Sequence, residues 1–259
     1  MEQTLFIGTA SWNIPREFLS AFPDQGSHLE KYSRRLKGVE INSSFYKEHQ
    51  AQTYRRWAQS TPPDFRFAVK LFQKFTHEQE LESSVKDLQR SIDPILQLEE
   101  KLAVLLIQLP PSLEFRDSHS DLFLARLRSV YSGAIAFEPR HRSWLQPEAL
   151  QMMKNYSLSK VFADPAPCPL PMSQSPLSGL VYFRLHGSPR IYKSEYTTKD
   201  LYTLRSKFNK VPEEIQQIWC IFDNTTYGYA TKNALDLQKI TQQPINFDFE
   251  RDFSENTLL

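Results

Sequence analysis

Short apolar runs recur along the whole chain, each bounded by turn or polar residues. They are rich in Val, Ile and Phe, which is typical of strands buried on both faces of a parallel sheet. The eight runs are Leu5–Thr9, Gly38–Asn42, Phe65–Lys70, Ala103–Gln108, Ala134–Glu138, Ser159–Ala163, Leu180–Leu185 and Ile218–Phe222. Their starts lie about 30 residues apart on average, the length of a strand followed by a helix. This spacing predicts an α/β protein, a TIM-type (β/α)8 barrel.

Amphipathic segments fill most of the gaps between these runs and predict the outer helices. They are Leu29–Leu36, Ala51–Gln59, Glu78–Glu100, Asp121–Val130, Pro147–Asn155, Lys199–Phe208 and Ala230–Ile240. We expect Pro94 to split the longest of them, and Pro165–Pro176 is too rich in proline to be helical. The sixth crossover is therefore expected to be a loop. We predict one domain over residues 1–259, with Gln243–Leu259 as a tail that covers one end of the barrel.

Length and composition narrow the function classes. The 259 residues fit one barrel, and the net charge of +1 does not favour nucleic acid as a partner. Only seven glycines are present and neither Gly-rich phosphate-loop motif occurs, which excludes Rossmann and P-loop folds. Cys168 and Cys220 form no zinc or disulfide pattern. No signal peptide or membrane-length apolar run is visible, so we predict a cytoplasmic protein without a membrane partner.

Polar side chains end most of the predicted strands, although charged residues are rare in strands buried on both faces. They are Glu40 and Asn42, Lys70, Gln108, Glu138 and Arg140, Asp164, Arg184 and His186, and Asn224. Members of one strand share a parity and should point to one side of it. In a barrel the carboxyl ends meet at one mouth, where α/β barrels place their active sites.

Three of these residues are candidates for acid–base chemistry. Glu40 and Glu138 form a carboxylate pair on strands that lie nearly across the barrel, which favours a separation of roughly 6.5–9.5 Å. His186, followed by Gly187, is the candidate imidazole for proton transfer or hydrogen bonding. We predict that Glu40, Glu138 and His186 are the catalytic residues. The alternative is that Glu138 only pairs with an arginine.

Cationic and aromatic residues make up the predicted substrate-binding set. Lys70, Arg140 and Arg184 would bind an anionic group, or else they neutralise carboxylates such as Asp164. Trp12 and Tyr46 could stack on a sugar or a base. The complete set is Trp12, Asn42, Tyr46, Lys70, His77, Gln108, Arg140, Asp164, Arg184 and Asn224.

Metal binding is the weaker interpretation of the histidines. His77, His141 and His186 follow three predicted strands, but no H-x-H, H-x-x-x-H or H-E-x-x-H spacing occurs. The arginines would also compete for the carboxylates. We therefore predict no metal site and no other cofactor.

Segments over most of the chain resemble a known family. They are GTASW (8–12), EINSSFY (40–46), FRFAVK (65–70), FTHE (75–78), LLIQLPPS (105–112), AFEPRHRSW (136–144), FADPAP (162–167), YFRLHG (182–187) and IFDNTTYGYATKNA (221–234). In this order they resemble the domain-of-unknown-function 72, or YecE-like, family over about residues 5–241. The resemblance implies a TIM-type barrel and carries no established activity. Ser11 departs from it, because the family usually has Gly before the Trp.

The leading functional hypothesis is an enzyme that acts by hydrolysis or proton transfer. Its substrate would be a small polar molecule with an anionic or sugar-like group, bound at the carboxyl end of the barrel. One alternative is a non-enzymatic module that holds a metabolite or a nucleic-acid end in the same cleft. A second is a metal-dependent phosphodiesterase or endonuclease. No sequence pattern indicates an oligomeric state.

Overall fold

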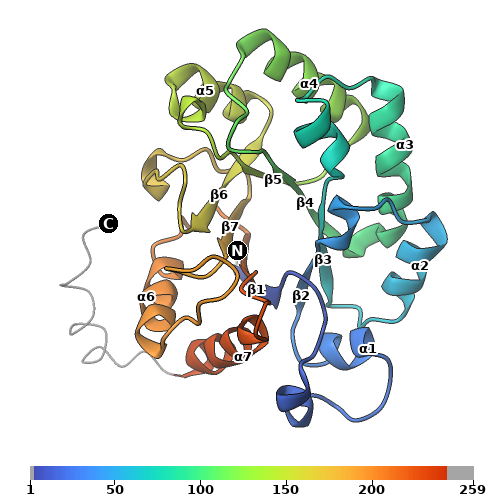
Figure 1. Cartoon of the computed structure of the whole chain (residues 1–259), viewed down its shortest axis with the longest axis vertical. Helices are drawn as coiled ribbons and strands as arrows, with labels where there is room; N and C mark the ends of the chain where they lie inside the picture. The colour runs from blue at the N-terminus through green and yellow to red at the C-terminus, as the bar shows by residue number, and fades with distance from the viewer. Residues whose placement is uncertain (1–2, 244–259) are drawn as a thin grey trace.

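Eight parallel strands form a nearly closed barrel in the computed structural model, which describes residues 3–243 (Figure 1). They are β1 Thr4–Thr9, β2 Gly38–Ile41, β3 Arg66–Lys70, β4 Leu102–Gln108, β5 Ile135–Glu138, β6 Leu158–Asp164, β7 Leu180–Leu185 and β8 Gln217–Phe222. The hydrogen-bonded order is β1-β8-β7-β6-β5-β4-β3-β2. Each neighbouring pair in this order is parallel. The predicted (β/α)8 architecture is confirmed.

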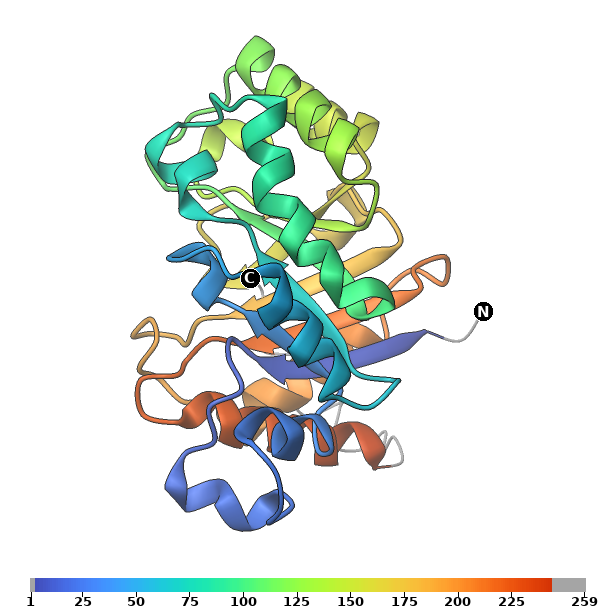
Figure 2. The same ribbon diagram turned by 90° about the vertical axis from the view of Figure 1, so that its right-hand side faces the viewer.

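Helices surround the strands, and Figures 1 and 2 show them on the outside of the barrel. The α-helices are α1 His28–Ser33, α2 Ala51–Gln59, α3 Val85–Ile95, α4 Asp117–Val130, α5 Pro147–Asn155, α6 Thr198–Phe208 and α7 Tyr229–Gln242. Short helical segments are η1 Arg16–Ala21, η2 Ser43–Phe45, η3 Lys74–Glu78, η4 Leu96–Lys101, η5 Arg142–Leu145 and η6 Met172–Gln174. Local sequence sets several starts. Pro147 opens α5, and Thr197 and Asp200 form a capping box before α6.

The structure decides two predictions about proline-containing segments. Pro94 does not separate two long helices, because it lies inside α3, one residue before that helix ends. The 3-10 segment η4 then continues the chain, and the break in the predicted helical stretch lies before α3 instead. Between β6 and β7 the structure has only the three-residue η6, so the proline-rich crossover is a loop as predicted. Of the predicted tail Gln243–Leu259, all residues after Gln243 lie outside the described residues.

The barrel divides its buried side chains into two layers. Side chains between strands and helices form the larger core, while a smaller group fills the lumen. Inside the lumen, Trp219 stacks on Phe6 at 4.8 Å and on Tyr182 at 5.9 Å between ring centroids. Alternate residues of a barrel strand face the same side, so these three rings lie together in the lumen. They form its apolar floor. Any polar group further along the lumen therefore lies above an apolar layer.

The barrel closes at a seam between β1 and β2. Within residues 3–243 no backbone ladder joins these strands, although they are in contact. The Tyr32 hydroxyl fills the gap: it accepts from the Thr9 amide at 2.9 Å and donates to the Gly38 carbonyl at 3.1 Å. A Cβ on Gly8 would lie 2.0 Å from the Gly38 carbonyl oxygen. Because Gly8 has no side chain, the two backbones can approach closely. The Tyr32 hydroxyl supplies hydrogen bonds in place of a ladder between β1 and β2.

Replacing Tyr32 by Phe tests this seam. The change strands a buried amide and a buried carbonyl, so we expect it to lower the free energy of unfolding by about 1–3 kcal/mol. Tyr156→Phe is the matched control, because its hydroxyl bonds to Asp121 at the surface, and it should cost less than about 0.5 kcal/mol. Urea unfolding of the two variants gives the comparison. Equal, small losses would show that the seam does not depend on the hydroxyl.

Candidate functional site

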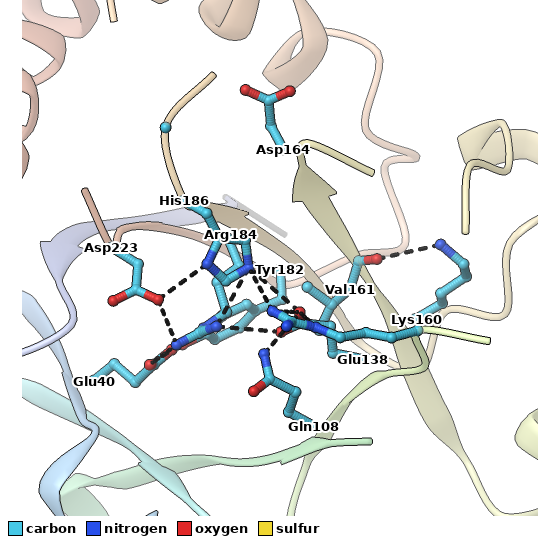
Figure 3. Close-up of polar contacts among 12 residues, drawn as sticks. Glu40, Gln108, Glu138, Lys160, Val161, Asp164, Tyr182, Arg184, His186 and Asp223 are labelled. Atoms are coloured by element: carbon cyan, nitrogen blue, oxygen red, sulfur yellow. Dashed lines mark hydrogen bonds and ion pairs between the residues drawn. The ribbon is translucent and has the colours of Figure 1, made fainter. Parts of the chain in front are cut away.

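Eight polar side chains meet at the carboxyl ends of the strands, further along the lumen than the aromatic floor. Figure 3 labels Glu40, Gln108, Glu138, Arg184, His186 and Asp223 among them, together with Tyr182 of the floor. We call this group the mouth cluster. It consists of Glu40, Lys70, Gln108, Glu138, Arg140, Arg184, His186 and Asp223. Seven of the eight were predicted from strand parity, and all except Arg140 are buried. The barrel register explains the convergence: Gln108 and Glu138, for example, are directly paired positions of β4 and β5.

Arg184 connects three carboxylates at the centre of the mouth cluster. Its Nη2 lies 2.8 Å from Glu40 Oε1 and 2.9 Å from Asp223 Oδ2, and its Nη1 lies 3.5 Å from Glu138 Oε2. Tyr182 donates its hydroxyl to Glu40 Oε2 at 2.9 Å, which ties the cluster to the floor. Burial alone would favour a neutral group, but the three carboxylates raise the pKa of Arg184 well above its usual value. Arg184 is therefore always charged.

Glu138 is the second centre. Its Oε1 accepts from Gln108 Nε2 at 2.9 Å and from Arg140 Nε at 3.0 Å, and lies 3.3 Å from His186 Nε2. Burial is the largest single influence on its pKa and raises it. Arg184, His186 and Arg140 together outweigh burial and hold the pKa of Glu138 well below the usual value. Glu138 is thus a permanent carboxylate at neutral pH, which does not suit a general acid.

His186 lies between two carboxylates. Its Nδ1 is 3.0 Å from Asp223 Oδ2, while Nε2 is 3.3 Å from Glu138 Oε1. Burial lowers the pKa of the imidazole, but hydrogen bonds to Asp223 and Glu138 outweigh it, and the pKa is raised above the usual value. Nε2 also lies 3.2 Å from Arg140 Nη2. A proton on this ring has carboxylate partners at both nitrogens.

Lys70 is the cation of the mouth cluster that has no anionic partner in contact. Its side chain is 4 % exposed, and Nζ makes no hydrogen bond or ion pair with any residue from 3 to 243. The nitrogen lies 3.9 Å from the centroid of the Phe45 ring. Burial, and then the charge of Arg184, lower the pKa of Lys70 to about 8, although the three carboxylates of the cluster oppose this. Both protonation states of the amine are accessible near neutral pH.

Asp164 and Asn224 lie away from the mouth cluster. Ala163 pairs with Arg184 and faces the lumen, so the next residue, Asp164, faces outward and accepts from the Tyr196 hydroxyl at 2.7 Å (Figure 3). Asn224 likewise faces out of the lumen and donates to Asn233 Oδ1 at 2.9 Å. Neither side chain joins the mouth cluster as predicted, because the residue before it, Ala163 in β6 or Asp223 just past β8, has the inward parity.

Asp223 is the member that sequence reasoning missed. Trp219 and Ile221 fill the lumen from β8, and Asp223 continues the same alternation just past the strand end. Counting parity from the apolar lumen residues, rather than from the last polar residue, identifies it.

Four predicted binding residues lie around the mouth cluster rather than in it. Trp12 and Asn42 line an open pocket of about 290 Å³ at the β1–β2 seam, together with Glu40. Asn42 Oδ1 is buried there and has no hydrogen-bond partner in the described part of the chain. His77 contacts the Phe45 ring, the same ring that Lys70 lies over, at 4.9 Å. Tyr46 is 66 % exposed, and its ring lies 5.0 Å from the ring of Phe45.

Residues 3–243 contain neither a metal-binding cluster nor a membrane-length helix. No three His, Cys, Asp or Glu side chains lie in an arrangement that could hold a metal ion. No helix there is both long enough and apolar enough to span a membrane.

Trp144, which follows β5, is fully buried and donates to the Leu113 carbonyl at 3.0 Å, so it packs in the core.

Known proteins resemble this chain in both sequence and fold. Residues 6–252 match the family described as "Protein of unknown function DUF72". The chain belongs to the DUF72 family. It is 22% identical to the UPF0759 protein YunF of Bacillus subtilis (strain 168), over 91% of this chain and 94% of that protein. Neither description names a reaction or a substrate.

Solved structures of two DUF72 family proteins share the barrel. One, from Enterococcus faecalis V583, has a TM-score of 0.76 at 23% identity and covers 94% of this chain and 97% of its own. The other, from Thermotoga maritima MSB8, has a TM-score of 0.75 at 23% identity, covering 93% and 100%. At this identity the likeness supports the fold alone.

Arg184 should be far more important for stability than Arg140. Arg184→Met leaves three buried carboxylates without their common cation, so we expect a loss of about 3–5 kcal/mol in unfolding free energy. Arg140→Met is the matched change, because Arg140 is 22 % exposed and Glu138 keeps its other partners. It should cost about 1 kcal/mol or less. Urea unfolding measures both, and comparable losses would contradict the central role given to Arg184.

Lys70→Met should stabilise the protein at pH 7 by roughly 1–3 kcal/mol, because the folded state holds the charged ammonium without a partner. The unfolded chain keeps this proton up to about pH 10.5, whereas the folded chain loses it near pH 8. Between those values the unfolded state binds more protons, so wild-type stability rises with pH and the advantage of the variant shrinks. Unfolding at pH 7 and 9.5, with exposed Lys193→Met as control, measures this. A variant less stable than wild type at pH 7 would contradict the argument.

Proposed function

We propose that this DUF72 protein is an enzyme that binds a small polar substrate by an anionic group at the mouth of the barrel and moves a proton there. The observation that carries the proposal is Lys70, a buried cation without an anionic contact. Leaving a charge buried and unpaired is costly, and folded proteins avoid it unless a partner arrives. An anionic substrate group supplies that partner.

The charge balance of the mouth cluster supports an anionic ligand. Glu40, Glu138 and Asp223 are matched in number by Arg140, Arg184 and Lys70, and the raised pKa of His186 favours a further positive charge. Arg140 is the partly exposed member and offers a planar guanidinium fork to a carboxylate or phosphate. Arg140 is therefore the cation of the cluster that a substrate entering from solvent meets first.

The geometry favours proton transfer over glycoside-type hydrolysis. That hydrolysis needs one carboxylic acid with a raised pKa beside a carboxylate. Here Arg184 contacts both Glu40 and Glu138, and the pKa of Glu138 is lowered. The carboxylates instead hold Arg184 and His186 in place, and His186 is the group that exchanges a proton. Fixed charges in a site largely closed to water supply electrostatic stabilisation of the transition state.

The Trp12 pocket suits the uncharged part of such a substrate. Its volume of about 290 Å³ matches a small metabolite, and the indole of Trp12 gives it an aromatic wall. Asn42 Oδ1 is a buried acceptor in need of a donor, which a substrate hydroxyl supplies. A polyol or sugar-like group next to the anionic group fits both features.

A binding module without turnover uses the same features, and the nucleic-acid and metal-dependent alternatives use the same mouth. Incubation with a tight-binding compound separates enzyme from module, because an enzyme converts the compound and a module returns it unchanged. A site for the anionic group is common to the enzyme and the metabolite-binding module, so it is tested first.

Glycerol 3-phosphate is a suitable probe because it combines an anion with hydroxyl groups and has no carbonyl. We expect it to raise the Tm of the wild-type protein with increasing concentration. Lys70→Met and Arg140→Met should each weaken binding about 10–100-fold by calorimetric titration, the cost of one charge-assisted hydrogen bond. Lys193→Met removes an equal charge from the exposed rim and should leave affinity within about twofold. Unchanged affinity in Lys70→Met, or no binding to wild type of either this probe or inorganic phosphate, would contradict the proposal.

A further inference from the structure

We propose that Lys70 acts as a nucleophilic amine and forms an imine with the carbonyl group of the substrate. This deepens the proposed function and rests on it, since it gives the anionic substrate a second required feature, an aldehyde or ketone. The substrate class is then an oxo acid or a carbonyl-containing phosphate.

Three buried lysines allow a direct comparison. Lys101 Nζ donates to the carbonyls of Ala58 and Thr61, each at 2.6 Å, and to the Thr61 hydroxyl at 3.1 Å. Lys160 Nζ donates to the Val161 carbonyl at 3.3 Å and points away from the mouth cluster (Figure 3). Lys70 Nζ makes no such bond within residues 3–243 and lies over the Phe45 ring. Among the three, Lys70 alone has a nitrogen that no protein acceptor holds.

The surroundings of Lys70 favour the reactive form of the amine. A lysine gains nucleophilic character when it is desolvated or lies near another cation. The charged groups that act on it are Glu40 from β2, Glu138 from β5, Arg184 from β7 and Asp223 after β8, and the titratable His77 of η3 also interacts with it. Burial and Arg184 together bring its pKa to about 8. About a tenth of the amine is then uncharged at pH 7, against less than about a thousandth for an exposed lysine.

The reaction balances without any further reagent. The Nζ lone pair attacks the carbonyl carbon, and the carbonyl π-electrons move to oxygen to give a carbinolamine after proton transfer from nitrogen to oxygen. The proton that the Lys70 ammonium released on becoming the free amine returns to that hydroxyl, and loss of water leaves a protonated imine. Addition of water reverses the sequence. The protonated imine carries the same single positive charge as the ammonium that it replaces. The three carboxylates of the mouth cluster therefore stabilise it equally well.

Reductive trapping tests the inference on the intact wild-type protein. Pyruvate and sodium cyanoborohydride are added, and the reduced adduct is located by peptide mass spectrometry. We expect Lys70 to be modified at least about tenfold faster than any other lysine at pH 7, because its uncharged fraction is larger. The Lys70 rate should rise with pH and level off above about pH 8. Glycerol 3-phosphate should slow the modification of Lys70 and leave exposed lysines unaffected.

Lys70→Arg separates this inference from the proposed function. Arginine keeps a positive charge for the anion but forms no imine under these conditions, so the variant should retain glycerol 3-phosphate binding and lose the preferred adduct. If wild-type protein binds the phosphate through Lys70 but pyruvate modifies lysines without preference for Lys70, the imine is overturned and the anion site stands. If Lys70 is trapped preferentially but glycerol 3-phosphate neither binds nor protects it, the imine stands and the anion site fails.

Discussion

The buried guanidinium of Arg184 is the interaction on which the mouth of this barrel depends. It contacts carboxylates from three separate places in the chain, Glu40, Glu138 and Asp223, and all of these groups are withdrawn from solvent. Removing so many charges from water is expensive, and a well-packed apolar layer often serves stability equally well or better. Stability therefore does not explain why the lumen changes from aromatic rings to charges within one layer. The proposed binding of an anionic substrate explains it, because such a site needs fixed charge at the mouth.

Arg184 also sets the protonation states around it. It keeps the pKa of Glu138 low, and the charged Glu138 in turn helps Asp223 to raise the pKa of the His186 imidazole. The same positive charge lowers the pKa of both Lys70 and His186 directly. For His186, the hydrogen bonds to Asp223 and Glu138 outweigh burial and Arg184, so its pKa is raised above the usual value. Titratable groups whose pKa values are pushed apart in one closed site are a common feature of acid–base catalysis.

The alternation of inward- and outward-facing residues along the strands predicts most members of the mouth cluster. It does not predict which of their side chains pair with one another. Glu40, Glu138, Arg184 and His186 stand at positions that face the lumen once the strand boundaries are known, so counting from the sequence was sufficient. It failed for Asp164 and Asn224, where a polar residue lies one position past the inward-facing one. The pairing of Arg184 with three carboxylates, and the absence of any such contact for Lys70, depend on side-chain reach across the lumen. The β1–β2 seam likewise depends on how closely Gly8 and Gly38 approach, which periodicity does not describe.

The two roles given to Lys70 require one property, a pKa near the working pH. A lysine with a pKa near 10.5 binds anions well but is almost never uncharged, and one with a very low pKa reacts but no longer attracts an anion. At about 8, the ammonium form predominates when an anionic group arrives, and the amine form is populated often enough to attack a neighbouring carbonyl. Burial beside Phe45 and Arg184 produces this intermediate value, while Glu40, Glu138 and Asp223 keep it from falling further. The charged groups whose burial costs folding free energy are therefore the same groups that hold the pKa of Lys70 at a value suited to both anion binding and nucleophilic attack.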